Sequence, residues 1–155
     1  IGRAGSLMAS EYINAYSFEH TDGMLTNRAI DYIKLAAPDF VFLYMVETDE
    51  KGGHDNGWMS ETYLKCIHDA IENVKTVIEK TKGEYTVIVT ADHGGHDRAH
   101  GSDMPEDMTI PMFFKTDRLE AGKELTDVSL LDIAPTVIEL AGLEPAPEWE
   151  GKSLV

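Results

Sequence analysis

Two short runs of almost continuous apolar residues constrain the fold of this chain more than any other feature. The first covers 40–46 (FVFLYMV) and the second covers 85–90 (YTVIVT). Neither run alternates apolar with polar side chains, as a strand with one solvent-exposed face would. Both are therefore predicted to be β-strands covered on both faces, as in a sheet that lies between layers of helices.

A helical pattern precedes each of these two runs. Apolar residues three to four positions apart predict one helix from Thr26 that Pro38 stops. They predict a second, longer helix that Ser60 opens and Gly83 ends. We expect the apolar stripe of this long helix, which includes Ile71, to be buried against the sheet.

The rest of the chain completes an alternation of helices and strands. The run 110–114 is predicted to be a short third strand, and Pro111 suggests an edge or early strand position. A last helix is predicted over 132–141. The first 25 residues show no period, so we expect irregular structure there with at most one short helix. The pattern predicts an α/β layered fold, and without a linker or repeat we expect a single domain over 1–155.

Composition and charge narrow the function classes. The chain has 28 Asp and Glu against 13 Lys and Arg, a net charge of -15. This balance argues against nucleic acid or an anionic membrane surface as a partner. No apolar run is long enough to span a bilayer and no targeting signal is visible, so we expect a soluble protein of undetermined localisation. The single cysteine, Cys66, excludes an internal disulfide and Cys-rich zinc folds, and we expect an inert core thiol.

Aspartate and histidine gather in two glycine-containing loops, each directly after a predicted strand. The loops cover 47–57 and 92–108, and they contain four of the six histidines: His54, His93, His96 and His100. Open α/β sheets place ligand sites at the carboxyl ends of their strands, and glycines allow tight turns there. Mixed Asp and His ligands without a thiolate suit zinc, manganese or iron better than calcium. The pattern predicts a metal site.

The order of these motifs resembles the alkaline phosphatase superfamily. The motifs are Asp49 with Gly53-His54, Asp92-His93-Gly94, His100-Gly101, Asp132-Ile133-Ala134-Pro135-Thr136 and Glu150-Gly151-Lys152-Ser153-Leu154. The branch most similar to this order is the type I phosphodiesterase and nucleotide pyrophosphatase group. The resemblance covers residues 38–155 and implies the C-terminal half of an αβα three-layer sandwich that holds two divalent metal ions, usually zinc, with manganese as the alternative.

The resemblance also implies which residues bind each metal. The residues that match the family ligands are Asp49, His54 and His100 for one metal, and Asp92 and His93 for the other. Five positions separate Asp49 from His54 where four are more usual, which leaves Glu50 and Asp55 open as substitutes. His96 is a possible additional ligand.

The family nucleophile, a Ser or Thr, and a further Asp ligand have no match here, because the equivalent stretch precedes Ile1. The resemblance therefore implies a fragment of a phosphate-ester hydrolase that needs its missing N-terminal half and is inactive alone. Ser60 is the one internal candidate nucleophile. The alternatives are a sulfatase-like member, a phosphosugar mutase-like member, and a non-catalytic metal-binding module.

Overall fold

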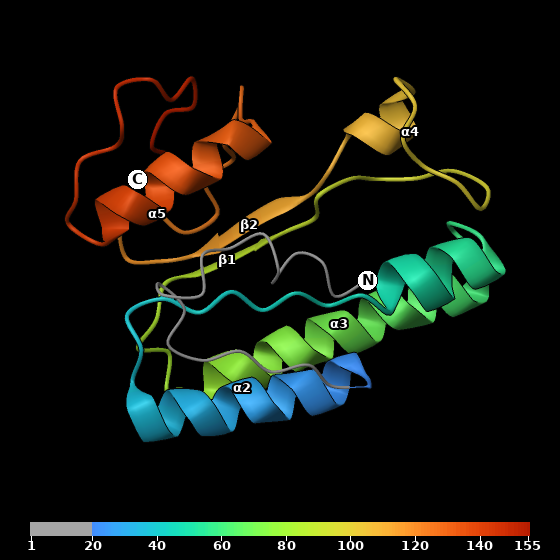
Figure 1. The fold of residues 1–155 in the computed structure, drawn as a ribbon, viewed down its shortest axis with the longest axis horizontal. Coiled ribbons are helices and arrows are strands. Elements are labelled where there is room, and N and C mark those ends of the chain that lie inside the picture. Colours follow the sequence, from blue (N-terminus) through green and yellow to red (C-terminus); the bar gives the residue numbers. More distant parts are fainter. Residues whose placement is uncertain (1–19) are drawn as a thin grey trace.

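The computed structural model describes residues 20–155, so most of the expectation for the first 25 residues lies outside the described range. The main elements are α2 (Asp22–Ala36), α3 (Glu61–Lys80), β1 (Val87–Thr90), α4 (Pro105–Met108), β2 (Met112–Lys115) and α5 (Ile133–Leu140). In Figure 1, α2 and α3 lie on one side of the β1–β2 pair and α5 lies on the other. The protein therefore has the predicted α/β fold, with helices on both sides of a sheet.

Helix α2 begins four residues earlier than the sequence pattern predicts. The Thr21 side chain caps the helix by accepting a hydrogen bond from Met24 N, at 3.2 Å. Thr26, the predicted start, instead lies inside the helix, and its hydroxyl donates to the Asp22 carbonyl. Both threonines suit a cap by residue type, and only the backbone conformation distinguishes them. The helix ends, as predicted, just before Pro38, with Ala37 in the left-handed region.

The prediction of a β-strand over 40–46 is wrong. This segment is extended but forms no strand, and the Phe42 side chain is 67% exposed. It still runs beside β1 in the same direction. Two hydrogen bonds show this: Tyr85 OH donates to Pro38 O at one end, and Tyr44 OH donates to Asp92 Oδ2 at the other. An apolar run indicates only that burial is favourable. A β-strand also requires a neighbouring strand whose backbone groups complete its hydrogen bonds.

The two observed strands pair antiparallel, with Val87 opposite Lys115 and Thr90 opposite Met112. Strand β2 begins two residues after the start of the predicted strand 110–114, since Pro111 has no N–H to donate. Helices lie on both sides of this pair (Figure 1), but they cover it only partly in the described residues. Strand β1 is half-buried, and Phe113 of β2 is 65% exposed.

Helix α3 has the predicted start, with Ser60 as its cap accepting from Tyr63 N at 3.1 Å. It packs against α2 and against the loop that precedes it. Its apolar stripe is only partly buried, and Ile71 is 48% exposed, which contradicts the expected burial. None of the described helices is long and apolar enough to cross a membrane.

The Asp132–Thr136 motif acts as an anchor for the C-terminal segment. The buried Asp132 carboxylate accepts from Ser129 N and from Lys152 N, both at 2.8 Å, and these bonds, Lys152 first, lower its pKa. Thr136 Oγ1 accepts from Leu154 N at 3.0 Å. The Asp132–Thr136 motif and the Glu150–Leu154 motif, which are distant in sequence, therefore form one structural unit around α5.

Candidate metal centre

The first candidate ligand loop folds as a π-helix, η2 (Thr48–His54). Gly52 N donates to Glu47 O, five residues earlier, at 2.9 Å. A π-helix has a wider turn than an α-helix, so residues five apart lie on one face. The unusual five-residue gap between Asp49 and His54 is therefore matched by a local change of helix type. Their side chains point to the same place, with Asp49 Oδ1 and His54 Nε2 3.7 Å apart.

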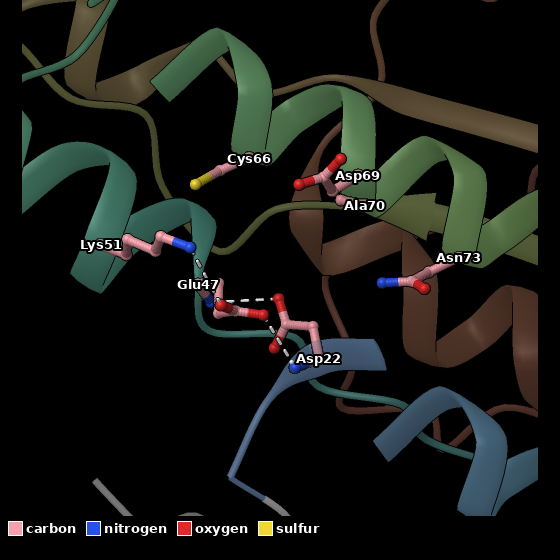
Figure 2. A pocket seen from close by; sticks show the side chains of 7 residues that line it. All are labelled: Asp22, Glu47, Lys51, Cys66, Asp69, Ala70 and Asn73. Carbon is pink, nitrogen blue, oxygen red and sulfur yellow. Dashed lines mark hydrogen bonds and ion pairs between the residues drawn. The ribbon is translucent and has the colours of Figure 1, made fainter. Parts of the chain in front are cut away.

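The start of α2 anchors this loop. The Asp22 carboxylate accepts from Val46 N at 2.9 Å and from Glu47 N at 3.1 Å, while Asp22 N donates to the Glu47 side chain (Figure 2). Burial raises the pKa of Asp22, although the two N–H donors oppose that shift. Beside these groups lies a cavity of about 20 Å³, which Cys66 helps to line. Burial raises the pKa of the Cys66 thiol, as expected for an inert core cysteine.

Three of the predicted ligands converge. One ligand atom from each of Asp49, His54 and His100 lies within 4.8 Å of the other two. The Asp49 Oδ1 atom is 3.9 Å from His100 Nε2. This oxygen is buried and has no hydrogen-bond partner among the described residues. Ligand atoms around a tetrahedral zinc lie roughly 3.3–3.5 Å apart, and the two distances from Asp49 Oδ1, 3.7 and 3.9 Å, are close to that spacing.

Hydrogen bonds to carbonyl oxygens set the tautomers of two histidines. His54 Nδ1 lies 3.1 Å from Arg98 O, and His93 Nδ1 lies 2.8 Å from Gly94 O. A carbonyl oxygen only accepts, so each Nδ1 carries the proton. In a neutral imidazole with this tautomer, the Nε2 atom has a free lone pair, the form that binds a metal.

The second predicted pair, Asp92 and His93, lies next to the first cluster. The His93 ring stacks on the His100 ring, with centroids 3.7 Å apart. Asp92 Oδ1 is 3.7 Å from His93 Nε2. The pair is placed by the connection between β1 and β2, so one long loop supplies His93 and His100 together.

Two aromatic residues near the site were not identified from the sequence. Tyr44 OH donates to Asp92 Oδ2 at 3.4 Å, and its pKa is raised by burial and then by the negative charges of Asp92 and Asp49. Trp58 packs against His54 and His100. The only sequence feature that could have indicated them is their position: Tyr44 precedes the first loop and Trp58 follows it.

His96, the possible additional ligand, lies outside the converging group. Its Nδ1–H donates to Asp107 Oδ1 at 2.7 Å. Asp107 is 3% exposed and also accepts from Ser102 N and Ser102 Oγ. Asp107 lies in helix α4, which was not predicted. The hydrogen bond from His96 therefore connects the second ligand loop to that helix.

This ion pair predicts a pH dependence of stability. The hydrogen bond to Asp107 raises the pKa of His96, and the bonds from His96 and then Ser102 lower the pKa of Asp107. The Asp107 contribution is complete above its unfolded pKa of about 3.9, and the His96 contribution below about 6.5. The melting temperature of wild type minus that of His96→Gln, measured in chelator, is therefore expected to be largest between these values. It should fall as pH rises through the raised pKa of His96.

The exposed His68 provides the control for this measurement. The same difference for His68→Gln should stay near zero at every pH. A wild-type advantage over His96→Gln that does not change with pH would contradict an ion pair at this position.

The α/β fold and the converging carboxylate and imidazole groups define a candidate metal-binding protein. The chain belongs to the Metalloenzyme superfamily, whose family model matches residues 5–145. This family is alkaline phosphatase-like and implies a divalent metal ion, as the motifs predict.

Curated relatives point to a branch other than the one expected. The chain is 34% identical over 135 residues to a 2,3-bisphosphoglycerate-independent phosphoglycerate mutase of Bacteroides thetaiotaomicron, covering 83% of this chain and 26% of the relative. It is 33% identical over 95 residues to the same enzyme of Parabacteroides distasonis, covering 58% and 17%. It is 25% identical over 126 residues to a phosphopentomutase of Alkaliphilus oremlandii, covering 81% and 31%. No solved structure matches the chain at a significant level.

Proposed function

We propose that this chain is the metal-binding part of an enzyme that moves a phosphoryl group between positions of a small phosphate ester, as a mutase does. The observation that carries the proposal is the buried Asp49 Oδ1, which has no hydrogen-bond partner within residues 20–155 and faces the Nε2 atoms of His54 and His100. A buried oxygen of this kind requires a compensating partner, and a divalent cation supplies one. The similarity to mutases supports the choice of reaction.

The residues have distinct roles in this proposal. Asp49, His54 and His100 hold one ion, and Asp92 and His93 contribute to a second, with zinc or manganese suited to both sites. Bound divalent ions lower the pKa of a hydroxyl nucleophile and offset negative charge on a phosphate ester. That offset is needed in a chain of net charge -15. The Arg98 and Gly94 carbonyls keep His54 and His93 in the metal-binding tautomer.

The proposal reverses the order of functions that the sequence motifs favoured. A phosphodiesterase or nucleotide pyrophosphatase came first there, and a mutase second. The relatives reported above are mutases, and none of the described contacts favours a diester, a sulfate ester or a non-catalytic role. The metal ligands are shared across the superfamily, so they do not separate these reactions by themselves.

The rest of the active site is proposed to lie elsewhere in the protein. The chain spans between 17% and 31% of the length of the relatives described above. We propose that another part of the same protein supplies the nucleophile and the remaining ligands of the second metal. Ser60 is a poor nucleophile candidate, because its hydroxyl caps α3 by accepting from Tyr63 N.

Product analysis tests the proposal. The full protein that carries this chain, loaded with manganese or zinc, is incubated with a phosphoglycerate or a pentose phosphate, and phosphorus NMR follows the products. We expect an isomeric phosphate ester without release of inorganic phosphate, and loss of both turnover and one bound metal in His100→Ala. His68→Ala, an exposed histidine outside the cluster, should behave as wild type.

Two results would contradict this proposal. Release of inorganic phosphate as the sole product would replace the mutase with a hydrolase. Turnover by residues 1–155 alone that disappears in Ser60→Ala would make Ser60 the nucleophile and remove the need for another part of the protein.

A further inference from the structure

We infer that Trp58 is a positioning residue that holds the two histidines of the first metal site at the separation a metal ion requires. The inference rests on the proposed metal site at Asp49, His54 and His100. It adds a residue that none of the motifs includes, and it explains how two loops distant in sequence present their imidazoles to one point.

The first observation is the contact between the indole and both imidazoles. The Trp58 and His54 ring centroids are 5.4 Å apart with the planes at 85°, and the Trp58 and His100 centroids are 5.9 Å apart at 66°. Both are edge-to-face arrangements, the geometry in which aromatic rings attract each other. His54 and His100 come from different loops, with ring centroids 5.1 Å apart. A single side chain thus fixes both rings relative to each other.

The second observation is that one glycine in each loop leaves room for the indole. A Cβ on Gly53 would lie 2.5 Å from the Trp58 ring, and a Cβ on Gly95 would overlap with the same ring. Gly53 directly precedes His54, and Gly95 lies between His93 and His100. The indole therefore fits between the two loop backbones, and a Cβ at either glycine would force it to move.

The third observation is a backbone connection at the same place. Trp58 N donates to Asp97 O at 2.7 Å, and the next carbonyl, Arg98 O, receives His54 Nδ1 at 3.1 Å. Asp97 has a positive φ of 47°, and the turn that contains it is closed by hydrogen bonds between His96 and Ala99. The first loop is thus tied to the second through both the backbone and the ring of Trp58.

A purely structural role would make Trp58 one more packed aromatic residue. Its side chain is only half-buried, and its ring contacts are with the candidate ligands His54 and His100 and with Tyr63 of α3. The two roles differ in what substitution changes. Loss of packing lowers stability, whereas loss of positioning lowers metal affinity even in protein that remains folded.

Calorimetric zinc titration of the full protein tests this difference. Trp58→Ala should bind zinc about 10- to 100-fold more weakly at the first site, the usual effect of losing a residue that orients a ligand. Trp58→Phe, which keeps an aromatic ring, should recover most of the affinity. Trp149→Phe, at the other tryptophan, should bind as wild type. Unchanged zinc affinity in folded Trp58→Ala would overturn the inference.

A second measurement does not depend on the stability of Trp58→Ala. The protein is labelled with 5-fluorotryptophan, and the fluorine resonance of Trp58 is identified by its disappearance in Trp58→Phe. Paramagnetic cobalt should shift or broaden this resonance strongly and leave that of Trp149 unchanged. Cobalt that binds without affecting the Trp58 resonance would overturn the inference and keep a metal site elsewhere. Absence of any metal binding by wild type would instead overturn the proposed metal site, and the inference with it.

Discussion

Asp49→Ala is expected to weaken metal binding at the first site by more than about 100-fold, since losing a residue outside the ligand set already costs roughly 10–100-fold. Asp49 provides the only carboxylate of the converging group, and its Oδ1 atom faces both imidazole Nε2 atoms. Calorimetric titration with zinc and with manganese measures the effect. In chelator the same variant should melt no lower than wild type, because the substitution removes a buried oxygen that has no hydrogen-bond partner in the described part of the chain.

The matched controls are Glu50→Ala and Asp55→Ala. Both residues flank the predicted ligands, and the sequence alone left both open as substitutes for Asp49. Neither belongs to the converging group, so both variants should bind metal as wild type. If either variant loses the metal while Asp49→Ala keeps it, the assignment of Asp49 is wrong, and the π-helical turn does not set the ligand spacing.

Gly94→Ala is expected to destabilise the second loop by about 3 kcal/mol or more, at the upper end of the range for overpacking. A Cβ at this position would overlap with Glu106 O and lie 3.0 Å from Thr109 O. Both are backbone atoms around α4 that cannot rotate away, and Gly94 N is itself bonded to Asp107 O at 2.7 Å. Chemical denaturation measures the loss of stability.

Gly23→Ala is the control for this substitution. Gly23 lies in α2, and a Cβ there would have no neighbour within 4 Å. Alanine in a helix is favoured over glycine, so stability should rise by up to about 1 kcal/mol. Equal stability of Gly94→Ala and wild type would mean that the loop and α4 do not pack as described. The His96–Asp107 bond would then lose its structural basis.

The sequence predicted the elements whose signals are local. The start of α3 followed from Ser60, a side chain that caps its own helix, and the end of α2 followed from Pro38. The candidate ligands could also be predicted, because Asp and His recur in two loops of similar composition. Asp49, His54 and His100 converge, and His93 stacks on His100.

Features that depend on residues distant in sequence could not be predicted from local patterns. The run 40–46 has strand composition but lacks strand hydrogen bonds, and Ile71 has the helical spacing of a core residue yet is 48% exposed. The binding partner of His96 was missed, because Asp107 lies eleven residues away on a short helix without periodicity. In each case the deciding group is a neighbour in space, which a local pattern does not contain.

From the sequence alone, the α/β class, the superfamily and a set of candidate metal ligands could be inferred, because residue type, spacing and motif order carry that information. How those residues meet follows from the folded arrangement of the two loops. This arrangement closes the five-residue gap from Asp49 to His54 with a π-helical turn, and it brings His100 to the same point across Trp58. The physical reason is that convergence depends on backbone hydrogen bonds and on ring contacts between two loops. Those contacts exist only after both loops have folded against each other.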